Sequence, residues 1–394
     1  MTVTQLPIIR TASTGRLRVL VVSESFLPQI NGVTNSVRRV LEHLAAAGHD
    51  ALLVAPTGPA TYAGFSVVRA RGANLWFYRD FRIGLETRHR LRSVMQRFRP
   101  DVVHVASPAT LGYQAVRVAG ELGIPTVAIY QTDLVGFAQR YEQKYGVSGG
   151  ARAMAALTRK IHLQVDRTLA PSTASLTQLD QLGVPRTVLW PRGVDVETFH
   201  PSRIDHELRR RVAPDGRLIV GYVGRLAAEK ELSLLIHLAG DDRYALVIVG
   251  GGPEEQRLRG LLPGAHFLGV LHGEELGASY ASLDVFVHTG RHETFCQSAQ
   301  EALASGVPVV APRSGGPVDI VDDGVTGLLY RPGDGEDLRR SVAFLADDHI
   351  LRRTMGRAGR VAVQGRSWQA INERLVEHYR DVVDDRLGRF KLSA

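Results

Sequence analysis

The sequence is poor in cysteine and has no long apolar run, and these two absences limit the class of protein. With Cys296 as its one cysteine, the chain forms no internal disulfide, which fits a reducing compartment. Its apolar stretches all fall short of the roughly 18 residues that a membrane-spanning helix needs. The histidines and Cys296 also lack the paired spacing of a zinc site. We therefore expect a cytoplasmic globular protein.

Signatures of nucleotide cofactors and of metal–diphosphate sites are weak. The run Gly250–Gly252 has neither the dinucleotide-binding spacing nor the P-loop pattern. The aspartate pairs lie in polar turns or at helix boundaries, where solvated carboxylates are expected; they are Asp241–Asp242, Asp322–Asp323 and Asp384–Asp385. The sequence therefore predicts no metal site and no bound cofactor.

The length of the chain limits the number of its domains, and its charge limits the kinds of partner it can have. Its 394 residues are enough for two domains, each with its own core. Lys and Arg number 48 against 40 Asp and Glu, and the net charge of +8 favours an anionic partner. No arginine-rich tail or RNA-binding aromatic signature accompanies this charge, so nucleic acid is not expected. Residues 1–16 are polar and predict a disordered leader.

Short apolar strands alternate with helices, and the alternation restarts at Leu218. This pattern is typical of doubly wound α/β domains with parallel sheets. We expect an N-terminal domain at 17–200, a linker at the charged stretch 201–214, a C-terminal domain at 215–370 and a final helical segment at 371–394. The main predicted strands are Arg18–Val22, Ala51–Ala55, Asp101–Val105, Thr126–Tyr130, Leu218–Val223, Ala245–Val249, Asp284–His288 and Val307–Ala311.

The stretch Arg291–Glu301 is the strongest candidate for a ligand site. It places Glu293 in the loop after the strand Asp284–His288 and Glu301 about two turns into the next helix. The backbone amides of Thr294 to Gln297 form the start of that helix, which favours anions such as phosphate. A nucleotide-sugar would suit two carboxylates on either side of an anion site. An ordinary strand–loop–helix with two surface glutamates has the same pattern.

Other candidates also follow predicted strands. Arg225 and Lys230 would neutralise a departing diphosphate, although solvated loop side chains are the alternative. Gly32 would let a ligand approach the backbone, or simply form a turn. Asp133 is either a catalytic or acceptor-binding group or the N-cap of the following helix.

The segment Leu75–Arg99 combines aromatic residues with many arginines. That mixture suits an anionic membrane surface. The same composition is also expected of a solvated helix face beside buried aromatics, so both interpretations stay open.

Together these motifs resemble retaining glycosyltransferases of family four, which have the GT-B fold of two Rossmann-like domains facing across a cleft. The most specific part is the pair Glu293 and Glu301 with seven residues between them. The sequence looks similar to actinobacterial GDP-mannose-dependent α-mannosyltransferases of glycolipid synthesis. Further matches are Gly224-Arg225-Leu226 with Glu229-Lys230, Pro191–Asp195 and the loop Phe26–Gly32.

The resemblance implies a role for each motif. Arg225 and Lys230 would hold the donor diphosphate, Glu293 the donor sugar and Glu301 the ribose. It also implies donor contacts from the backbone of Gly32, Phe295, Cys296 and Gln297, and contacts to the nucleobase from Gly269 and Val270. Relatives often carry histidine where this chain has Gln131, so Gln131 and Asp133 are expected on the acceptor side with a changed geometry. The final helix would cross back to the N-terminal domain.

The function implied is metal-independent transfer of mannose from GDP-mannose to a lipid-linked or glycolipid acceptor at the inner membrane face. A UDP-sugar-dependent glucosyl- or sulfoquinovosyl-type transferase on diacylglycerol lipids is the alternative within the class. A non-catalytic nucleotide-sugar-binding protein is the alternative outside it, although such a protein would not need the cations Arg225 and Lys230.

Overall fold

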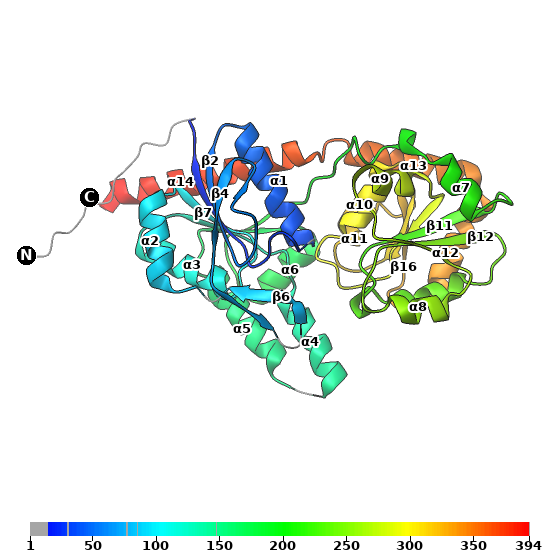
Figure 1. The fold of residues 1–394 in the computed structure, drawn as a ribbon, viewed down its shortest axis with the longest axis horizontal. Helices are drawn as coiled ribbons and strands as arrows, with labels where there is room; N and C mark the ends of the chain where they lie inside the picture. The colour runs from blue at the N-terminus through cyan, green and yellow to red at the C-terminus, as the bar shows by residue number, and fades with distance from the viewer. Residues whose placement is uncertain (1–14, 30, 76–77, 85, 147, 394) are drawn as a thin grey trace, which may run out of the picture. The chain divides into compact units, whose positions relative to one another are not determined.

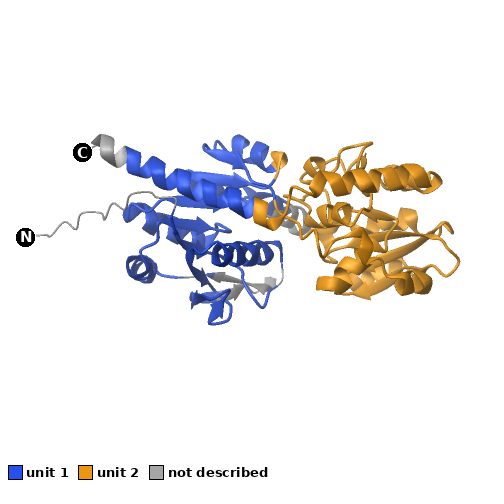
Figure 2. Cartoon of the chain, turned by 90° about the horizontal axis from the view of Figure 1, so that it is seen from above, with its two compact units in different colours: residues 1–171, 175–191, 371–394 blue, residues 172–174, 192–370 orange. Residues whose placement is uncertain are grey.

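The chain folds into two compact units in a computed structural model that describes residues 15–29, 31–75, 78–84, 86–146 and 148–393 (Figure 1). Unit 1 consists of Met1–Pro171, Ser175–Pro191 and Ile371–Ala394, and unit 2 of Ser172–Ala174 and Arg192–Ala370 (Figure 2). The expected leader at 1–16 lies outside the described residues except for Gly15 and Arg16. None of the helices in the described part combines the length and apolar character needed to cross a membrane.

Unit 1 is built on an eight-stranded sheet of order β10-β9-β8-β7-β1-β2-β4-β3, in which only the β3–β4 pair is antiparallel. The strands are β1 (Arg18–Val22), β2 (Asp50–Ala55), β3 (Thr61–Tyr62), β4 (Phe65–Arg69), β7 (Val102–Val105), β8 (Thr126–Ile129), β9 (Arg167–Ala170) and β10 (Thr187–Leu189). β5 (Gly72–Leu75) and β6 (Tyr78–Gly84) form a separate hairpin. The helices are α1 (Gly32–Ala46), α2 (Arg88–Phe98), α3 (Thr110–Glu121), α4 (Leu134–Tyr145), α5 (Gly150–His162) and α6 (Thr173–Gln181).

The last helix, α14 (Trp368–Ser393), completes the core of unit 1. Its apolar face joins the cluster formed by the first strands and α1, through Ile371, Leu375, Val376, Tyr379 and Val382. The Tyr379 hydroxyl hydrogen-bonds Nδ1 of buried His104 at 2.6 Å. The Trp190 indole donates to the Ile371 carbonyl at 2.9 Å. The end of the chain is therefore part of the first unit.

Unit 2 has a six-stranded, fully parallel sheet of order β13-β12-β11-β14-β15-β16. Its strands are β11 (Leu218–Val223), β12 (Tyr244–Val249), β13 (His266–Gly269), β14 (Val285–Val287), β15 (Val309–Pro312) and β16 (Gly327–Tyr330). Its helices are α7 (His206–Val212), α8 (Glu255–Leu261), α9 (Gly273–Ala281), α10 (Gln297–Ala304), α11 (Pro317–Ile320), α12 (Gly335–Asp347) and α13 (His349–Val363), with 3₁₀ turns η1 (Pro201–Arg203), η2 (Ala228–Lys230) and η3 (Leu232–Leu238). One mainly parallel and one fully parallel sheet, both with helical crossovers, confirm the α/β prediction.

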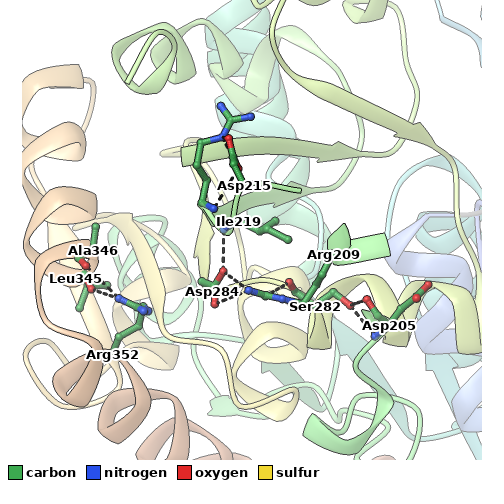
Figure 3. Close-up of polar contacts among 10 residues, drawn as sticks. Asp205, Arg209, Asp215, Ile219, Ser282, Asp284, Leu345, Ala346 and Arg352 are labelled. Carbon is green, nitrogen blue, oxygen red and sulfur yellow. Dashed lines mark hydrogen bonds and ion pairs between the residues drawn. The ribbon is translucent and has the colours of Figure 1, made fainter. Parts of the chain in front are cut away.

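The expected linker at 201–214 is wrong, because this stretch is folded into unit 2. Leu208 and Val212 of α7 are buried in the unit 2 core. Arg209 donates to the Ser282 carbonyl at 2.7 Å and to the Asp284 carboxylate at 3.0 Å (Figure 3). Arg209, one of the charges that suggested a solvated linker, is thus paired with a neighbouring element. The chain instead passes between the units at Pro171–Ser172, Ala174–Ser175, Pro191–Arg192 and Ala370–Ile371.

Candidate functional site

At the carboxyl edge of the unit 2 sheet, the backbone of the loop after β12 packs directly against the backbone of the loop after β11. Gly250, after β12, has φ +133°, and a Cβ atom there would lie 1.9 Å from the Gly224 carbonyl oxygen. Gly252 has φ +155°, and its Cβ would lie 2.3 Å from the Leu226 carbonyl oxygen. These conformations favour glycine, and no side chain fits the space. The loops after β11 and β12 are therefore held together at this edge.

Lys230 and Glu293 meet at this edge. Lys230 ends the turn η2 after β11, and Glu293 lies in the loop after β14. The Lys230 ammonium donates a hydrogen bond to Oε1 of Glu293. Their side chains are only 20% and 18% exposed, so the pair is largely shielded from solvent. The structure thus brings together two residues that are 63 positions apart and that the sequence predicted to share a site.

Both groups of this pair stay charged at neutral pH. Burial alone would raise the pKa of Glu293, but the charges of Lys230 and of the nearby His288 imidazole hold that pKa far below its usual value. Burial would likewise lower the pKa of Lys230, but the Glu293 carboxylate raises it above the ordinary lysine value. The site therefore offers a ligand both the Glu293 carboxylate and the Lys230 ammonium.

Arg225 lies at the same edge with a different partner. Its guanidinium forms an ion pair with Glu229 one turn along, and its side chain is 50% exposed. The structure thus places both predicted cations after β11. Lys230 is bound to Glu293, whereas Arg225 is bound to Glu229.

Helix α10 begins at Gln297, and Glu301 lies just over one turn into it. The expected two turns were too many, because the segment before Gln297 is an irregular loop that ends with Cys296 at φ +76°. Oε2 of Glu301 accepts a hydrogen bond of 3.0 Å from the hydroxyl of Tyr280. The loop backbone is fixed from the opposite side, where the Gly316 amide donates to the Glu293 carbonyl at 2.8 Å.

The remaining donor-side candidates of unit 2 lie on the same loops. Phe295 and Cys296 are buried just before α10. The Gln297 amide group donates to the Gly193 carbonyl at 3.0 Å. Gly269 ends β13 with φ +74°, and its carbonyl accepts from the Gly250 amide at 2.7 Å. Val270 beside it is 61% exposed. All these positions therefore follow parallel strands at one edge.

The sequence reasoning did not single out two buried cationic side chains near Glu293. His288 is 2% exposed, and its Nε2 lies 3.3 Å from Oε1 of Glu293. Arg192 is 7% exposed, and burial lowers its pKa to about 10 although the Glu293 charge partly offsets that effect. For His288 the available signal was its position directly after the buried strand β14. Arg192 comes three residues after the end of β10, which is not a buried strand, so its local sequence gave no comparable signal.

The candidates of unit 1 lie at the carboxyl ends of β1 and β8. Gly32 is the first residue of α1. Gln131 is buried and donates to the Ala106 carbonyl. Asp133 caps α4, since its Oδ1 accepts from the Gly136 amide at 2.8 Å. Asp133 thus has the capping role that the sequence allowed, while its contact with an acceptor stays a prediction.

A buried carboxylate of unit 1, Glu24, was also missed. Its oxygens accept hydrogen bonds from the backbone amides of Gly84 at 3.2 Å, Leu111 at 2.7 Å and Gly112 at 3.1 Å. Burial raises the pKa of Glu24 to about 7 even though these amides lower it. The side chain joins the hairpin β5–β6 to the start of α3, which is a structural role.

The arginines predicted for a membrane surface lie partly on α2. Arg88 and Arg97 are exposed, whereas Arg92 pairs with Glu121 and Arg90 with Glu86. Trp76, Phe77 and Leu85 of the same segment lie outside the described residues. Within the part of the chain that the structure describes, no cluster of three or more His, Cys, Asp or Glu is arranged as metal ligands.

Comparison with known proteins identifies the family. The protein-family model described as Glycosyltransferase Family 4 matches residues 30–198. The family model described as Glycosyl transferases group 1 matches residues 204–362. A GDP-mannose-dependent alpha-mannosyltransferase of Mycobacterium tuberculosis (strain CDC 1551 / Oshkosh) is 48% identical over 374 residues, which cover 93% of this chain and 97% of the relative. The chain belongs to glycosyltransferase family 4.

Other relatives and a solved structure are also similar to this chain. A GDP-mannose-dependent alpha-mannosyltransferase of Mycolicibacterium smegmatis is 46% identical and covers 96% of this chain and 100% of its own. The Arabidopsis thaliana protein Sulfoquinovosyl transferase SQD2 is 32% identical, with 90% and 72% covered. Sucrose-phosphate synthase from Thermosynechococcus elongatus superposes with a TM-score of 0.76 at 22% identity, covering 94% of this chain and 100% of the other. The predicted GT-B fold and glycosyltransferase class are confirmed.

Proposed function

We propose that this family 4 enzyme transfers mannose from GDP-mannose to a lipid-linked or glycolipid acceptor, with retention of configuration and without a metal ion or cofactor. The observation that carries the proposal is the shielded Lys230–Glu293 pair at the carboxyl edge of the unit 2 sheet. An ammonium there suits a diphosphate, and the adjacent carboxylate suits sugar hydroxyls. Support for the donor comes from relatives at 44–48% identity that are named GDP-mannose-dependent.

Lys230 and Arg225 act on the leaving group in this proposal. The bond between the anomeric carbon and the donor phosphate oxygen breaks, and negative charge accumulates on the departing diphosphate. Two cations after β11 stabilise that charge as it develops, which lowers the barrier. The half-exposed Arg225 exchanges Glu229 for phosphate when the donor binds.

Glu293 holds hydroxyls of the mannose, and Glu301 holds the ribose. In this proposal the backbone of Phe295–Gln297 binds the diphosphate, and Gly269 and Val270 bind the base. Gly32 of unit 1 stays a predicted contact of the diphosphate. A bond forms between the anomeric carbon and the acceptor oxygen on the face that the phosphate leaves. The acceptor proton passes to the departing phosphate oxygen, so no carboxylate base is required. Gln131 and Asp133 contact the acceptor.

A donor screen tests this proposal. We expect GDP-mannose to raise the melting temperature and to be consumed with release of GDP, with the same rate in the presence of EDTA. At a hundred times its dissociation constant, a ligand adds about 2.7 kcal/mol of stability, which a thermal shift assay detects easily. UDP-glucose and UDP-sulfoquinovose are the matched controls. Preference for either UDP-sugar would favour the alternative, and a strict metal requirement would contradict the mechanism.

We further propose that the enzyme reaches its acceptor at the inner face of the cell membrane through the segment Leu75–Arg99. The exposed arginines Arg88 and Arg97 on α2 support an electrostatic contact with anionic lipid headgroups. Relatives named for phosphatidylinositol dimannoside and for diacylglycerol substrates support a lipid acceptor.

Charge reversal on α2 is expected to weaken binding to anionic vesicles. Each basic residue near such a surface contributes about 1 kcal/mol, so Arg88→Glu with Arg97→Glu should lower binding by more than tenfold. Co-sedimentation with vesicles rich in anionic lipid measures it. The double variant Arg353→Glu with Arg357→Glu, which changes exposed arginines of α13, is the control. Equal binding by both double variants would argue for a solvated helix face.

A further inference from the structure

His288 follows β14 at the carboxyl edge of the unit 2 sheet, and both its backbone and its ring are held by neighbouring groups. Its amide donates to the Val310 carbonyl at 2.9 Å, and its own carbonyl accepts from the Tyr330 hydroxyl at 3.2 Å. The imidazole stacks on Tyr222 with ring centroids 6.2 Å apart and planes 19° from parallel. A Cβ atom on Gly290 would lie 3.2 Å from Nε2, so the ring also occupies the space beside this glycine.

The buried ring has little besides Glu293 and Cys296 to bind. Neither ring nitrogen has a hydrogen bond of full geometry among the described residues, although the ring is 2% exposed. An incompletely bonded polar group at such depth costs free energy, which fits a role other than packing. The polar atom close to it is Oε1 of Glu293, 3.3 Å from Nε2, and this is the same oxygen that accepts from Lys230.

Once a donor is bound, the Lys230 ammonium therefore has two possible anionic partners, the Glu293 carboxylate and the donor phosphate. A phosphate that draws the ammonium away would leave the Glu293 carboxylate in a mostly buried position without its main partner. An unpaired carboxylate in such a place tends to take up a proton or to move. Lys230 has a flexible side chain. In His288, by contrast, the backbone amide and carbonyl are both hydrogen-bonded, and the ring stacks on Tyr222.

We propose that His288 is a positioning residue that keeps the Glu293 carboxylate ionised and oriented toward the donor sugar while Lys230 turns to the diphosphate. The inference rests on the proposed function, because it assigns a second partner to the sugar-binding glutamate. It also explains why one oxygen of Glu293 faces two cations in the same loop system. Thr289 connects these parts, since its hydroxyl donates to the Lys230 carbonyl.

The charges around His288 give this role a pH dependence. Burial lowers the pKa of His288, but the Cys296 sulfur and the Glu293 carboxylate together raise it to about 9. Tyr222 lies against the ring, and Lys230 and Arg192 face Glu293 from other loops. The imidazolium is therefore present at neutral pH and is lost as the pH rises through about 9. The support for Glu293 is lost over the same interval.

His288→Gln tests the inference, since it keeps a hydrogen-bond donor of similar size without the charge. We expect GDP to bind as in the wild type, because Lys230 and Arg225 are retained. The additional affinity of GDP-mannose over GDP should fall about tenfold, and kcat should fall more than KM rises. The acid limb of the kcat profile should move to higher pH, because Glu293 has lost a positive neighbour. The matched control is His162→Gln, which changes a buried histidine of unit 1.

A measurement on the wild-type enzyme keeps the test independent of how the variant folds. The affinity ratio of GDP-mannose to GDP should decline between pH 8 and pH 10 or so, as the imidazolium with a pKa of about 9 deprotonates. A constant ratio over that interval, or a His288→Gln enzyme with the wild-type ratio and pH profile, would overturn the inference. Absence of any binding of GDP-mannose to the wild type would instead refute the proposed function.

Discussion

Lys230→Ala is expected to lower kcat for mannosyl transfer by about two to three orders of magnitude, the usual effect of removing one preorganised group that stabilises developing charge. Lys230 is the shielded cation of the site, and Arg225 is 50% exposed, so the remaining arginine replaces it poorly. The variant also leaves Glu293 without its ammonium partner, with His288 still 3.3 Å away, which disturbs the binding of the sugar.

Steady-state rates with GDP-mannose as donor, combined with thermal unfolding, measure this effect. Lys160→Ala is the matched control, because it removes the same side chain from the exposed face of α5. A folded Lys230→Ala enzyme within threefold of the wild-type kcat would contradict the assignment of the leaving-group cation. A loss of similar size in the control would point to a general effect of charge instead.

Gly250→Ala is expected to destabilise unit 2 by about 3–5 kcal/mol. The added methyl group would lie 1.9 Å from the Gly224 carbonyl oxygen, so the backbone must move. Overpacking costs about 1–3 kcal/mol, and a residue forced into a conformation reserved for glycine costs a similar amount. Because the same backbone forms the loop before Arg225, the affinity for GDP should fall as well.

Urea unfolding and GDP titration together measure this loss. Gly260→Ala is the matched control, since Gly260 lies within α8 and a Cβ atom there meets nothing within 4 Å. It should be neutral or stabilising by up to about 1 kcal/mol, because alanine favours a helix. An equally stable Gly250→Ala protein would show that the two loops are not held together as described.

Lys230 and Glu293 each follow a strong apolar strand, so the sequence was sufficient to predict their two loops. Parallel strands bring their carboxyl ends to one edge, so Lys230 and Glu293 meet without any local signal. The alternatives at single residues were harder to decide. Asp133 is an N-cap in the structure. Its position in the sequence was equally compatible with that role and with a role in binding or catalysis.

Other features depended on tertiary contacts that the local pattern does not contain. The stretch 201–214 is polar, yet Arg209 is paired with Asp284, a residue 75 positions later. His288 and Arg192 became candidates only when their burial and their proximity to Glu293 were known. The start of α10 was misplaced because Cys296 adopts φ +76°, a conformation that a non-glycine residue seldom shows.

The placement of α14 in unit 1 fixes the order in which the two units are able to finish folding during synthesis. Unit 2 is nearly one continuous segment, Arg192–Ala370, which leaves the ribosome as a complete set of strands and helices. Unit 1 begins first but lacks Ile371, Leu375, Val376, Tyr379 and Val382 until the whole of Arg192–Ala370 has been synthesised. At about 5–20 residues per second, the earlier sheet waits some ten seconds or more for its covering helix. The unit that is translated second is thus the first that is able to fold completely.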